Sequence, residues 1–388
     1  MSYLDHYNCV HCNKTYSLIE DQFVCQDCGH LLFAEYDLYR ARQELYQGFS
    51  ANGSSIWKYA DLLPLDSERK PVTLHEGDPR FLRLQKMSTQ NSANLFVMDE
   101  GRNPSGSIRD REMSVLFSAL KQNDSDGVLI SGSPNSCISA AAYAAQSGVF
   151  CHVVIPNTVP LQFLGELNSY GATVHLCKTT GDHCKRLEEE LMAANRLQKI
   201  NAGSTPFRIE GAKTVLFDLW EIFKYKLPDF IFVPLGEGVT VLGIWKGLKE
   251  LKQLGWLQSA FPQVVVVESA HRAPLSKAFG NAVYSEEEMK DTVAIEMNNA
   301  APLEIELLKT IFEEENWQII ALEDDLILKI RKQIAQVEGI LISPEGSATI
   351  GAYRSLKNLL GKQKNHTAVF INPVSGIKYV QSVGFLKT

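Results

Sequence analysis

The chain lacks the features that mark several protein classes. Its longest apolar runs are strand-sized, such as Val264–Val267, whereas a membrane-spanning helix needs about 20 apolar residues. No basic block stands out among 38 Lys+Arg and 45 Asp+Glu, and the formal net charge of −7 disfavours nucleic acid as a partner. The first residues do not combine a charged segment with an apolar one, as a secretory signal does. We expect a cytoplasmic protein that contacts neither membranes nor nucleic acid.

Composition excludes fibrous and disordered classes. The 388 residues are 45% hydrophobic and 21% charged, with 26 Gly and 15 Pro. These values differ from those of collagen, coiled coils and disordered chains. The length predicts two or three domains of about 100–200 residues each, and a chain of this size buries a large core.

Four of the eight cysteines lie within the first 28 residues, at Cys9, Cys12, Cys25 and Cys28. Two Cys-x2-Cys pairs separated by twelve residues place four thiolates in the tetrahedron that structural Zn²⁺ prefers. The segment is too small and too poor in apolar residues to fold without such a staple. The sequence therefore predicts a structural zinc ribbon, with no open position for catalysis. The alternative is a degenerate ribbon whose reduced cysteines have lost the metal.

The other four cysteines are scattered along the chain, at Cys137, Cys151, Cys177 and Cys184. Disulfides rarely persist in a reducing cytoplasm. We therefore expect these thiols to be reduced.

Apolar runs and helical periodicities alternate from about Asn94 onward, after an expected helix at Asp37–Phe49 and a linker at Ser50–Ser55. We expect strands at Leu95–Met98, Gly127–Ser131, Phe150–Ile155, Thr173–Cys177, Asp229–Pro234, Gln263–Glu268 and Thr367–Asn372. Helices are expected between them, at Ile108–Lys121, Ser139–Gln146, Leu161–Tyr170, Asp182–Asn195, Lys213–Tyr225, Val241–Leu254, Asp324–Gln336 and Ser347–Leu360. Alternation of this kind predicts an α/β fold with parallel sheets, whose ligands bind at the carboxyl ends of strands.

Several turns match one family in order. They are Ser54-Ser-Ile-Trp57-Lys-Tyr59, Leu62-Leu-Pro64, Leu74-His-Glu76-Gly77, Asn103-Pro104-Ser-Gly106-Ser107-Ile-Arg109-Asp110-Arg111, Ser133-Pro-Asn135, Glu210-Gly211-Ala-Lys213, Gly236-Glu-Gly238 and Gly376-Ile-Lys378. This set resembles the threonine synthases over nearly the whole chain, and a four-cysteine ribbon also occurs in that family. The resemblance implies the fold-type-II architecture of pyridoxal-phosphate (PLP) enzymes, usually dimeric. It implies a ribbon over residues 1–45, a large α/β domain of 46–110 with 206–388, and a small α/β domain of 111–205.

The family's chemistry needs a lysine that forms a Schiff base with PLP and then shuttles protons. The position that corresponds to this lysine is Arg109, in a register fixed by its matching neighbours. A guanidinium has a pKa above about 12, so it neither attacks an aldehyde nor acts as a base at neutral pH. The resemblance thus implies that the family's nucleophile is missing.

Three more segments of the expected cofactor site depart from the family. Pro134 stands inside the Ser-Gly-Asn turn and must reshape it, although Asn135 remains. In the phosphate loop, Glu237 would repel an anion by about 4 kcal/mol at 4 Å and an effective dielectric near 20, a cost that nearly vanishes if its side chain points to solvent. Val239 stands where the family has a glycine. Pro373 offers no hydroxyl to a pyridine nitrogen, and Ser375 is the one substitute considered.

Four losses at one cofactor site, on an intact scaffold, favour a pseudoenzyme that binds no PLP. Such a scaffold would form a homodimer and bind a protein partner or an anionic small molecule. We expect ligand-cleft residues at Ser107, Arg109, Asp110 and Ser133, and cofactor-loop residues at Asn135, Gly236, Gly238 and Thr240. Without a ligand, Asp110 or Glu237 is expected to hold the Arg109 guanidinium.

The second hypothesis is an active enzyme, either a PLP-dependent lyase or synthase acting on an amino acid, or a new reaction in the same cleft. Lys213 is a candidate replacement lysine, although a lysine near a helix start is usually structural. Cys137, near the start of an expected helix, is either a reactive thiolate or a buried packing residue. The pair His271-Arg272, after an expected strand, is either a ligand site or an ordinary surface pair.

Overall fold

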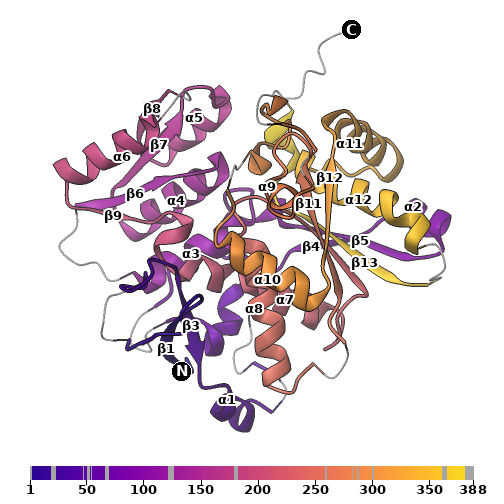
Figure 1. The fold of residues 1–388 in the computed structure, drawn as a ribbon, viewed down its shortest axis with the longest axis horizontal. Helices are drawn as coiled ribbons and strands as arrows, with labels where there is room; N and C mark the ends of the chain where they lie inside the picture. The colour runs from indigo at the N-terminus through magenta and orange to yellow at the C-terminus, as the bar shows by residue number, and fades with distance from the viewer. Residues whose placement is uncertain are drawn as a thin grey trace. The chain divides into compact units, whose positions relative to one another are not determined.

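The computed structural model describes most of the chain (Figure 1). The described residues are 2–18, 23–46, 48–49, 53, 55–65, 70–120, 126–178, 182–257, 260–281, 283–285, 288–298, 301–360 and 365–380. Of the expected linker Ser50–Ser55, residues 50–52 and 54 lie outside this set, as does Lys121 at the end of an expected helix.

The chain divides into two compact units. Unit 1 comprises residues 1–77 and 109–214, and unit 2 comprises residues 78–108 and 215–388. Each unit contains its own wholly or mostly parallel sheet. Across the part of the chain that the structure describes, no helix is both long and apolar enough to cross a membrane.

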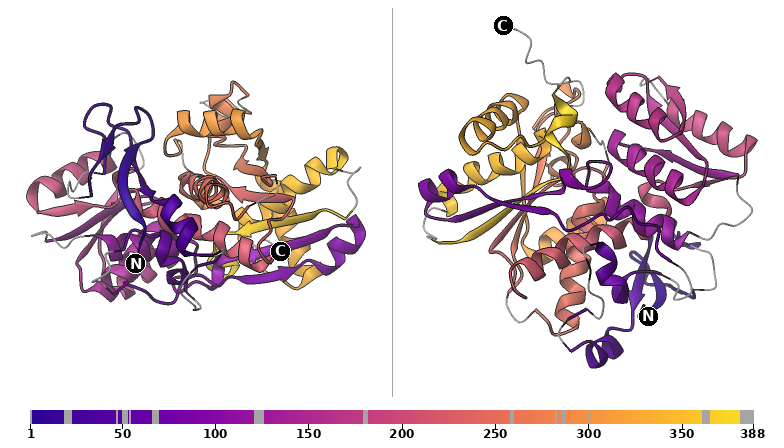
Figure 2. Two further views of the ribbon diagram at one scale, coloured as in Figure 1. Left: turned by 90° about the horizontal axis from the view of Figure 1, so that it is seen from below. Right: turned by 180° about the vertical axis from the view of Figure 1, so that it is seen from behind.

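Unit 1 begins with a small antiparallel sheet, drawn in indigo in Figure 2. Its strands are β1 (Leu4–Cys9), β2 (Thr15–Tyr16) and β3 (Leu32–Tyr36), in the order β2-β1-β3. Helix α1 (Leu38–Glu44) follows, and the Asp37 side chain caps it by accepting a hydrogen bond from Arg40 N. The sequence predicted this helix as far as Phe49. It ends earlier because Tyr46 takes a positive φ of 36°, which no α-helical residue has.

The rest of unit 1 is an α/β layer. Its four-stranded sheet is parallel, in the order β8-β7-β6-β9. The strands are β6 (Gly127–Ser131), β7 (Cys151–Pro156), β8 (Thr173–Cys177) and β9 (Leu197–Lys199). Helices α4 (Pro134–Ser147), α5 (Leu161–Ser169) and α6 (His183–Ala194) connect them, as Figures 1 and 2 show. Unit 1 also holds η1 (Ile56–Leu62), α3 (Arg109–Ala119), η3 (Ala202–Ser204) and the start of α7 (Phe207–Ile222).

Unit 2 is built on a six-stranded sheet in the order β12-β11-β10-β13-β5-β4, parallel except for β4. The strands are β4 (Arg80–Arg83), β5 (Asn94–Asp99), β10 (Phe230–Pro234), β11 (Gln263–Ser269), β12 (Gln318–Leu322) and β13 (Thr367–Asn372). The helices are α2 (Gln85–Asn91), α8 (Val239–Gln253), α9 (Pro274–Ala278), α10 (Ile305–Glu315), α11 (Asp324–Glu338) and α12 (Pro344–Leu360), with short turns η2 (Glu100–Arg102), η5 (Ile295–Met297) and η6 (Gly376–Tyr379). One core joins the sheet to α2, α11 and α12, with Phe232, Ile330 and Tyr353 among its members.

The alternating α/β order expected from the sequence is confirmed. Strand β8 has the expected bounds, whereas α4 begins five residues earlier than expected and α7 six residues earlier. Strand β12 and helix α10 were not expected at all. Each of the three expected domains contains one of the three sheets, and their exact boundaries stay a prediction.

The expectation that the scattered cysteines are all reduced is wrong. Cys177, the last residue of β8, forms a disulfide with Cys184, in the first turn of α6, and their Cα atoms lie 5.0 Å apart. The redox state of a compartment does not determine how close two cysteines lie, and this Cα separation falls within the usual disulfide range.

A buried carboxyl group marks the carboxyl end of the unit 2 sheet. Glu345, in the first turn of α12, is fully buried, and its Oε1 accepts hydrogen bonds from Glu296 N and Tyr379 Oη, both at 3.1 Å. Its Oε2 has no hydrogen-bond partner. Burial, and then repulsion by the Glu296 carboxylate, raises the pKa of Glu345 to about 7. At pH below 7, this carboxyl group is therefore protonated in the folded protein.

This raised pKa predicts a pH-dependent stability. Between the ordinary value of 4.5 and about 7, the folded protein keeps a proton that the unfolded chain releases. The contribution of Glu345 to the free energy of unfolding is therefore greatest below pH 4.5 and falls by about 3 kcal/mol as the pH rises to 7. Urea unfolding of Glu345→Gln from pH 5 to 8 should show the variant gaining stability over the wild type as the pH rises.

The matched control is Glu306→Gln, at a carboxyl group whose side chain is 70% exposed on α10. Its unfolding curve should follow that of the wild type at every pH. If Glu345→Gln also runs parallel to the wild type, the carboxyl group does not hold a proton in the folded state.

Candidate functional site

The candidate site residues fall in both units. Unit 1 carries Arg109 and Asp110 at the start of α3, and Ser133 and Asn135 at the start of α4. Unit 2 carries the other four, Ser107, Gly236, Gly238 and Thr240. All of them lie in turns or first helical turns, where an α/β fold places its ligand-binding groups.

The start of α4 accommodates the unexpected proline. Pro134 takes the first helical position, where its fixed φ suits the helix and its missing N–H leaves no bond unmade. Ser133 is the N-cap: its Oγ accepts a hydrogen bond from Ser136 N at 3.3 Å and donates to Ser136 Oγ at 3.0 Å. Asn135 is fully buried in the first turn. The turn is therefore reshaped as part of a helix, which explains why α4 begins earlier than expected.

Arg109 belongs to a buried ion-pair network. Its Nη1 donates to Glu112 Oε1 at 2.7 Å, and the two side chains are 6% and 0% exposed. The other carboxylate oxygen of Glu112 accepts from Arg208 on α7 at 2.7–2.8 Å. Arg208 Nη2 also donates to Ser136 Oγ at 3.1 Å. The first turns of α3, α4 and α7 are thus connected through charged groups, and Glu112 and Arg208 are participants that the sequence analysis missed.

A glycine permits α3 and α7 to lie this close. A Cβ atom placed at Gly211 would lie 2.7 Å from Glu112 Cα and even closer to the Arg111 carbonyl. Only glycine therefore fits at this crossing. Arg111 Nη1 donates across the same contact to Thr214 Oγ1 at 2.9 Å.

Two further carboxylates bind α4. Asp110 accepts a hydrogen bond from Ser139 Oγ, and Glu76 accepts one from Tyr143 Oη, both at 2.5 Å. Burial, followed by the charges of Asp110 and Glu76, raises the pKa of Tyr143 above its ordinary value. Tyr143 therefore stays a hydrogen-bond donor at any physiological pH.

Lys213 is tied into the structure of unit 1. It is fully buried in α7, with its Nζ 2.5 Å from Glu210 Oε2 and 4.1 Å from the centre of the Tyr36 ring. Tyr36 Oη donates to the same carboxylate at 2.6 Å. This arrangement joins β3 of the ribbon to α7 and favours the structural interpretation of Lys213.

In unit 2, the turn from β10 into α8 carries the residues of the expected phosphate loop. Gly238 has a φ of +87°, in the left-handed region that favours glycine. The Glu237 carbonyl accepts a hydrogen bond from Leu303 N at 2.9 Å. Val239, the first residue of α8, is fully buried, whereas Glu237 and Thr240 are half-buried. The turn therefore packs its valine inward.

Ser107 lies on a bridge between two loops of unit 2. It pairs with Val374, and Ile108 N donates to the Pro373 carbonyl at 2.7 Å. Pro373 is buried and contributes its backbone oxygen to this contact. The side chain of Lys378 lies over Gly106, because a Cβ built on that glycine would be 3.0 Å from Lys378 Cε. Lys378 is a lysine beside the signature turn that the sequence analysis did not single out.

The remaining candidates have ordinary surroundings. Cys137 is fully buried within α4. The His271 ring stacks on Tyr284 with ring centres 5.1 Å apart, and its Nε2 lies 3.8 Å from a Glu323 carboxylate oxygen. Arg272 pairs with Asp291 at 2.5 Å. These contacts fit packing and surface pairing.

The ribbon cysteines converge on one point. The sulfur atoms of Cys9, Cys12, Cys25 and Cys28 all lie within 4.8 Å of one another, and the closest separations are 3.5, 3.6 and 3.7 Å. Four sulfurs bound tetrahedrally at 2.3 Å to one Zn²⁺ would be about 3.8 Å apart. The Tyr16 hydroxyl donates to Cys25 Sγ at 3.2 Å and lowers the pKa of that thiol to about 6. The cluster fits a zinc ribbon.

Comparisons with known proteins agree with this architecture. Residues 72–373 match the family model described as "Pyridoxal-phosphate dependent enzyme". The chain is 28% identical to the threonine synthase of Methanosarcina acetivorans, over 97% of this chain and 93% of that protein. It is also 28% identical to the threonine synthase of Methanocaldococcus jannaschii, over 90% and 86%.

Solved structures share the fold. An O-ureido-L-serine synthase matches with a TM-score of 0.67 and 17% identity, over 82% of this chain and 96% of that chain. The serine racemase of Dictyostelium discoideum matches with a TM-score of 0.64 and 21% identity, over 77% and 92%. With the family model spanning most of the sequence, this chain belongs to the family of pyridoxal-phosphate dependent enzymes.

Proposed function

We propose that this chain is a threonine synthase-like pseudoenzyme that forms no Schiff base with PLP and serves as a scaffold for an anionic small molecule or a protein partner. The observation that carries the proposal is the buried ion pair between Arg109 and Glu112, at the position that the resemblance assigns to the Schiff-base lysine. A permanently protonated guanidinium has no lone pair with which to attack an aldehyde. The planar fork of arginine suits a carboxylate or a phosphate.

The surroundings of Arg109 support a structural role for its charge. Glu112 lies between Arg109 and Arg208, so the three groups stabilise one another without any cofactor. Removing one member of such a buried set leaves an uncompensated charge, which typically costs about 3–5 kcal/mol. Arg109 therefore contributes to the stability of the fold through its ion pair with Glu112.

The residues at the other cofactor positions also fit PLP poorly. Ser133 Oγ is engaged in capping its own helix. The Glu237 side chain adds negative charge where a phosphate would bind, and the buried Val239 keeps its backbone from the close approach that glycine allows. Pro373 has no side-chain donor. When bound, PLP supplies an electron sink for amino-acid chemistry.

The alternative is an active enzyme. It is favoured by the match to a PLP-dependent family over residues 72–373 and by the similarity to threonine synthases over 97% of the chain. Lys378, beside Gly106, would be the lysine to consider as a substitute anchor. A homodimer is proposed under either hypothesis, because the resemblance implies one.

The decisive test is addition of PLP followed by borohydride reduction. We expect no visible chromophore, no trapped adduct and no threonine from phosphohomoserine, because Arg109 is not a nucleophile. Arg109→Lys alone should yield at most a weak adduct, since Pro134, Glu237, Val239 and Pro373 remain and a misplacement of about 1 Å can cost 100-fold in rate. The threonine synthase of M. jannaschii is the positive control.

Peptide mapping identifies the lysine that carries any reduced PLP adduct, and two results would contradict the proposal. An adduct on Lys378 in the wild type would establish an unusual anchor and support the enzyme alternative. Synthase activity switched on by Arg109→Lys alone would mean that the remaining site is intact. Either outcome overturns the pseudoenzyme proposal.

The ion-pair network predicts a large stability loss for Glu112→Gln. The neutral amide leaves Arg109 and Arg208 without a buried counter-charge, so the free energy of unfolding should fall by about 3–5 kcal/mol. Denaturant unfolding measures this loss. Glu189→Gln, at an exposed carboxylate on α6, is the control and should change the stability by less than about 0.5 kcal/mol. A loss as small as that of the control would remove the structural basis of the proposal.

We infer that the four ribbon cysteines bind one structural Zn²⁺ per chain, because their sulfur separations match a tetrahedral site. Metal analysis should find about one zinc, and Cys25→Ser should release it. Limited proteolysis should then cleave the first 30 residues while the α/β core stays intact. Cys151→Ala, which removes a buried thiol outside the ribbon, should keep its zinc. A protein without metal whose ribbon still resists proteolysis would contradict the inference.

A further inference from the structure

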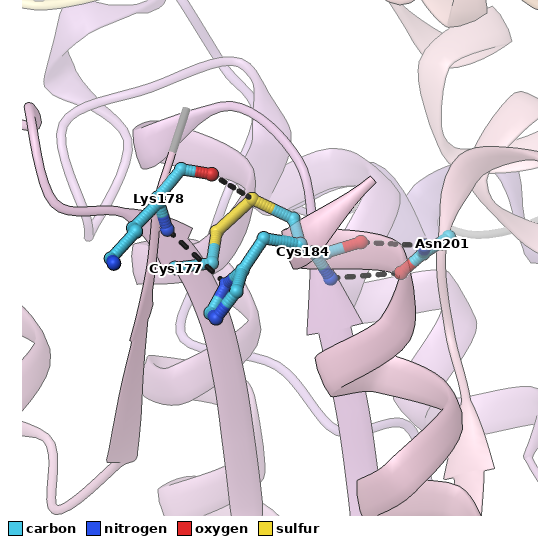
Figure 3. Close-up of a disulfide and its surroundings, with 6 residues drawn as sticks. Cys177, Lys178, Cys184 and Asn201 are labelled. Carbon is cyan, nitrogen blue, oxygen red and sulfur yellow. Dashed lines mark hydrogen bonds between the residues drawn. A yellow bond between two sulfur atoms is a disulfide. The ribbon is translucent and has the colours of Figure 1, made fainter. Parts of the chain in front are cut away.

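The disulfide between Cys177 and Cys184 lies at the carboxyl edge of the four-stranded sheet of unit 1 (Figure 3). Cys177 ends β8, and its carbonyl accepts a hydrogen bond from Asn157 N at 2.8 Å. At the same edge, Ser131 at the end of β6 exchanges two hydrogen bonds of 2.9 Å with the Asn201 side chain. The disulfide is therefore set in a hydrogen-bonded edge of the sheet.

The two sulfurs have different surroundings. Cys177 is 1% exposed and packs in an apolar cluster with Leu129, Val154 and Leu197. Cys184 is only partly buried. It is the second residue of α6, a helix of twelve residues, whose N-terminal dipole stabilises a thiolate. An incoming thiol therefore reaches Cys184 Sγ more easily than Cys177 Sγ.

We propose that Cys177 and Cys184 form a reversible redox site, at which Cys184 exchanges with low-molecular-weight thiols and Cys177 is the buried partner. The proposal stands on the disulfide itself, on the unequal burial of its two sulfurs and on the helix N-terminus at Cys184. It does not depend on whether the chain is a pseudoenzyme. It adds a modification site on unit 1 that the chemistry of the PLP family does not require.

The reduction balances in two exchange steps. A thiolate of the small thiol attacks Cys184 Sγ, the bond between the protein sulfurs breaks, and Cys177 leaves as a thiolate that takes a proton. A second thiolate then attacks the external sulfur of the mixed disulfide, and Cys184 leaves as a thiolate next to the α6 dipole. Two small thiols are oxidised to one external disulfide, and the protein disulfide gains two electrons. One proton goes to Cys177, and a second binds when the Cys184 thiolate is protonated. Oxidation runs the same steps in reverse.

Reduction removes the crosslink between the end of β8 and the start of α6. The disulfide links residues seven positions apart, and a crosslink of this size stabilises the fold chiefly by limiting the unfolded chain. The apolar contacts of Cys177 with Leu129 and Val154, and of the adjoining Leu187 and Leu191 on α6, do not require the crosslink. The reduced protein should therefore stay folded with a lower melting temperature, by about 5 °C.

The test titrates the wild-type protein with glutathione buffers of increasing oxidised fraction, followed by rapid alkylation and peptide mapping. We expect the Cys177 and Cys184 peptides to pass together from alkylated to disulfide-linked within this range, and to return on transfer to the reduced buffer. A result in either the fully reduced or the fully oxidised buffer can overturn the proposal. A pair that stays linked in fully reduced glutathione is a permanent structural disulfide, and a pair that stays alkylated in the oxidised buffer is not a disulfide site.

Variants separate this pair from the ribbon thiols. Cys184→Ser should melt at the temperature of the reduced wild type in every buffer, whereas Cys151→Ala should keep the redox-dependent shift of about 5 °C. Zinc release, followed in the same buffers with a chromogenic chelator, reports on the ribbon separately. A redox-dependent shift that persists in Cys184→Ser would assign the effect to other cysteines and refute the proposal. Should Cys184→Ser fail to fold, the wild-type peptide map still decides.

Discussion

The interaction on which unit 1 most depends is the buried set of charges at the start of α3. Four consecutive residues, Arg109 to Glu112, alternate in sign, and all four are at most 5% exposed. With Arg208 and Glu76, they make three positive and three negative side chains in one interior. Charges taken out of water are tolerated only when they are paired and hydrogen-bonded. This balance requires both signs, so the arginine at position 109 satisfies an electrostatic constraint of its own interior.

That constraint fits the pseudoenzyme that we propose, because paired buried charges stabilise the fold at the position that the resemblance assigns to a reactive lysine. A lysine that reacts with an aldehyde must be able to lose its proton and move freely. Arg109 keeps its proton and is held by Glu112, which Arg208 holds from the other side. The starts of α3, α4 and α7 are joined through Glu112, Ser136 and Arg208, and Gly211 permits the close approach of α3 and α7. A reactive lysine has to lose its proton, whereas a buried ion pair needs a residue at position 109 that keeps its charge.

The sequence predicted the elements whose signal is local and missed those that depend on distant contacts. Buried parallel strands such as Phe230–Pro234 are continuous apolar runs, and they were recognised from that pattern alone. Strand β12 alternates weakly in burial and lies at the edge of its sheet, which explains why its pattern was overlooked. Helix α4 was placed too late because Pro134 was interpreted as a turn residue, whereas proline also suits the first helical position. Motif spacing identified the ribbon cysteines, but it could not reveal that Cys177 and Cys184 meet.

The candidate site was predicted from residues that depart from a family pattern. Their interaction partners were missed because they depart from no pattern. Arg109 stood out because the resemblance assigns a lysine to its position, whereas Glu112, its ion-pair partner three residues on, belongs to no motif that the sequence analysis used. The ribbon shows a comparable dependence. Tyr36 on β3 donates to Glu210, which pairs with Lys213 on α7, and Phe23 packs edge-on against Phe207, next to Arg208. The same helix thus anchors the ribbon through Glu210 and pairs with Glu112 through Arg208. Because α7 makes both contacts, the four-cysteine ribbon and the charged interior of unit 1 share one structural support.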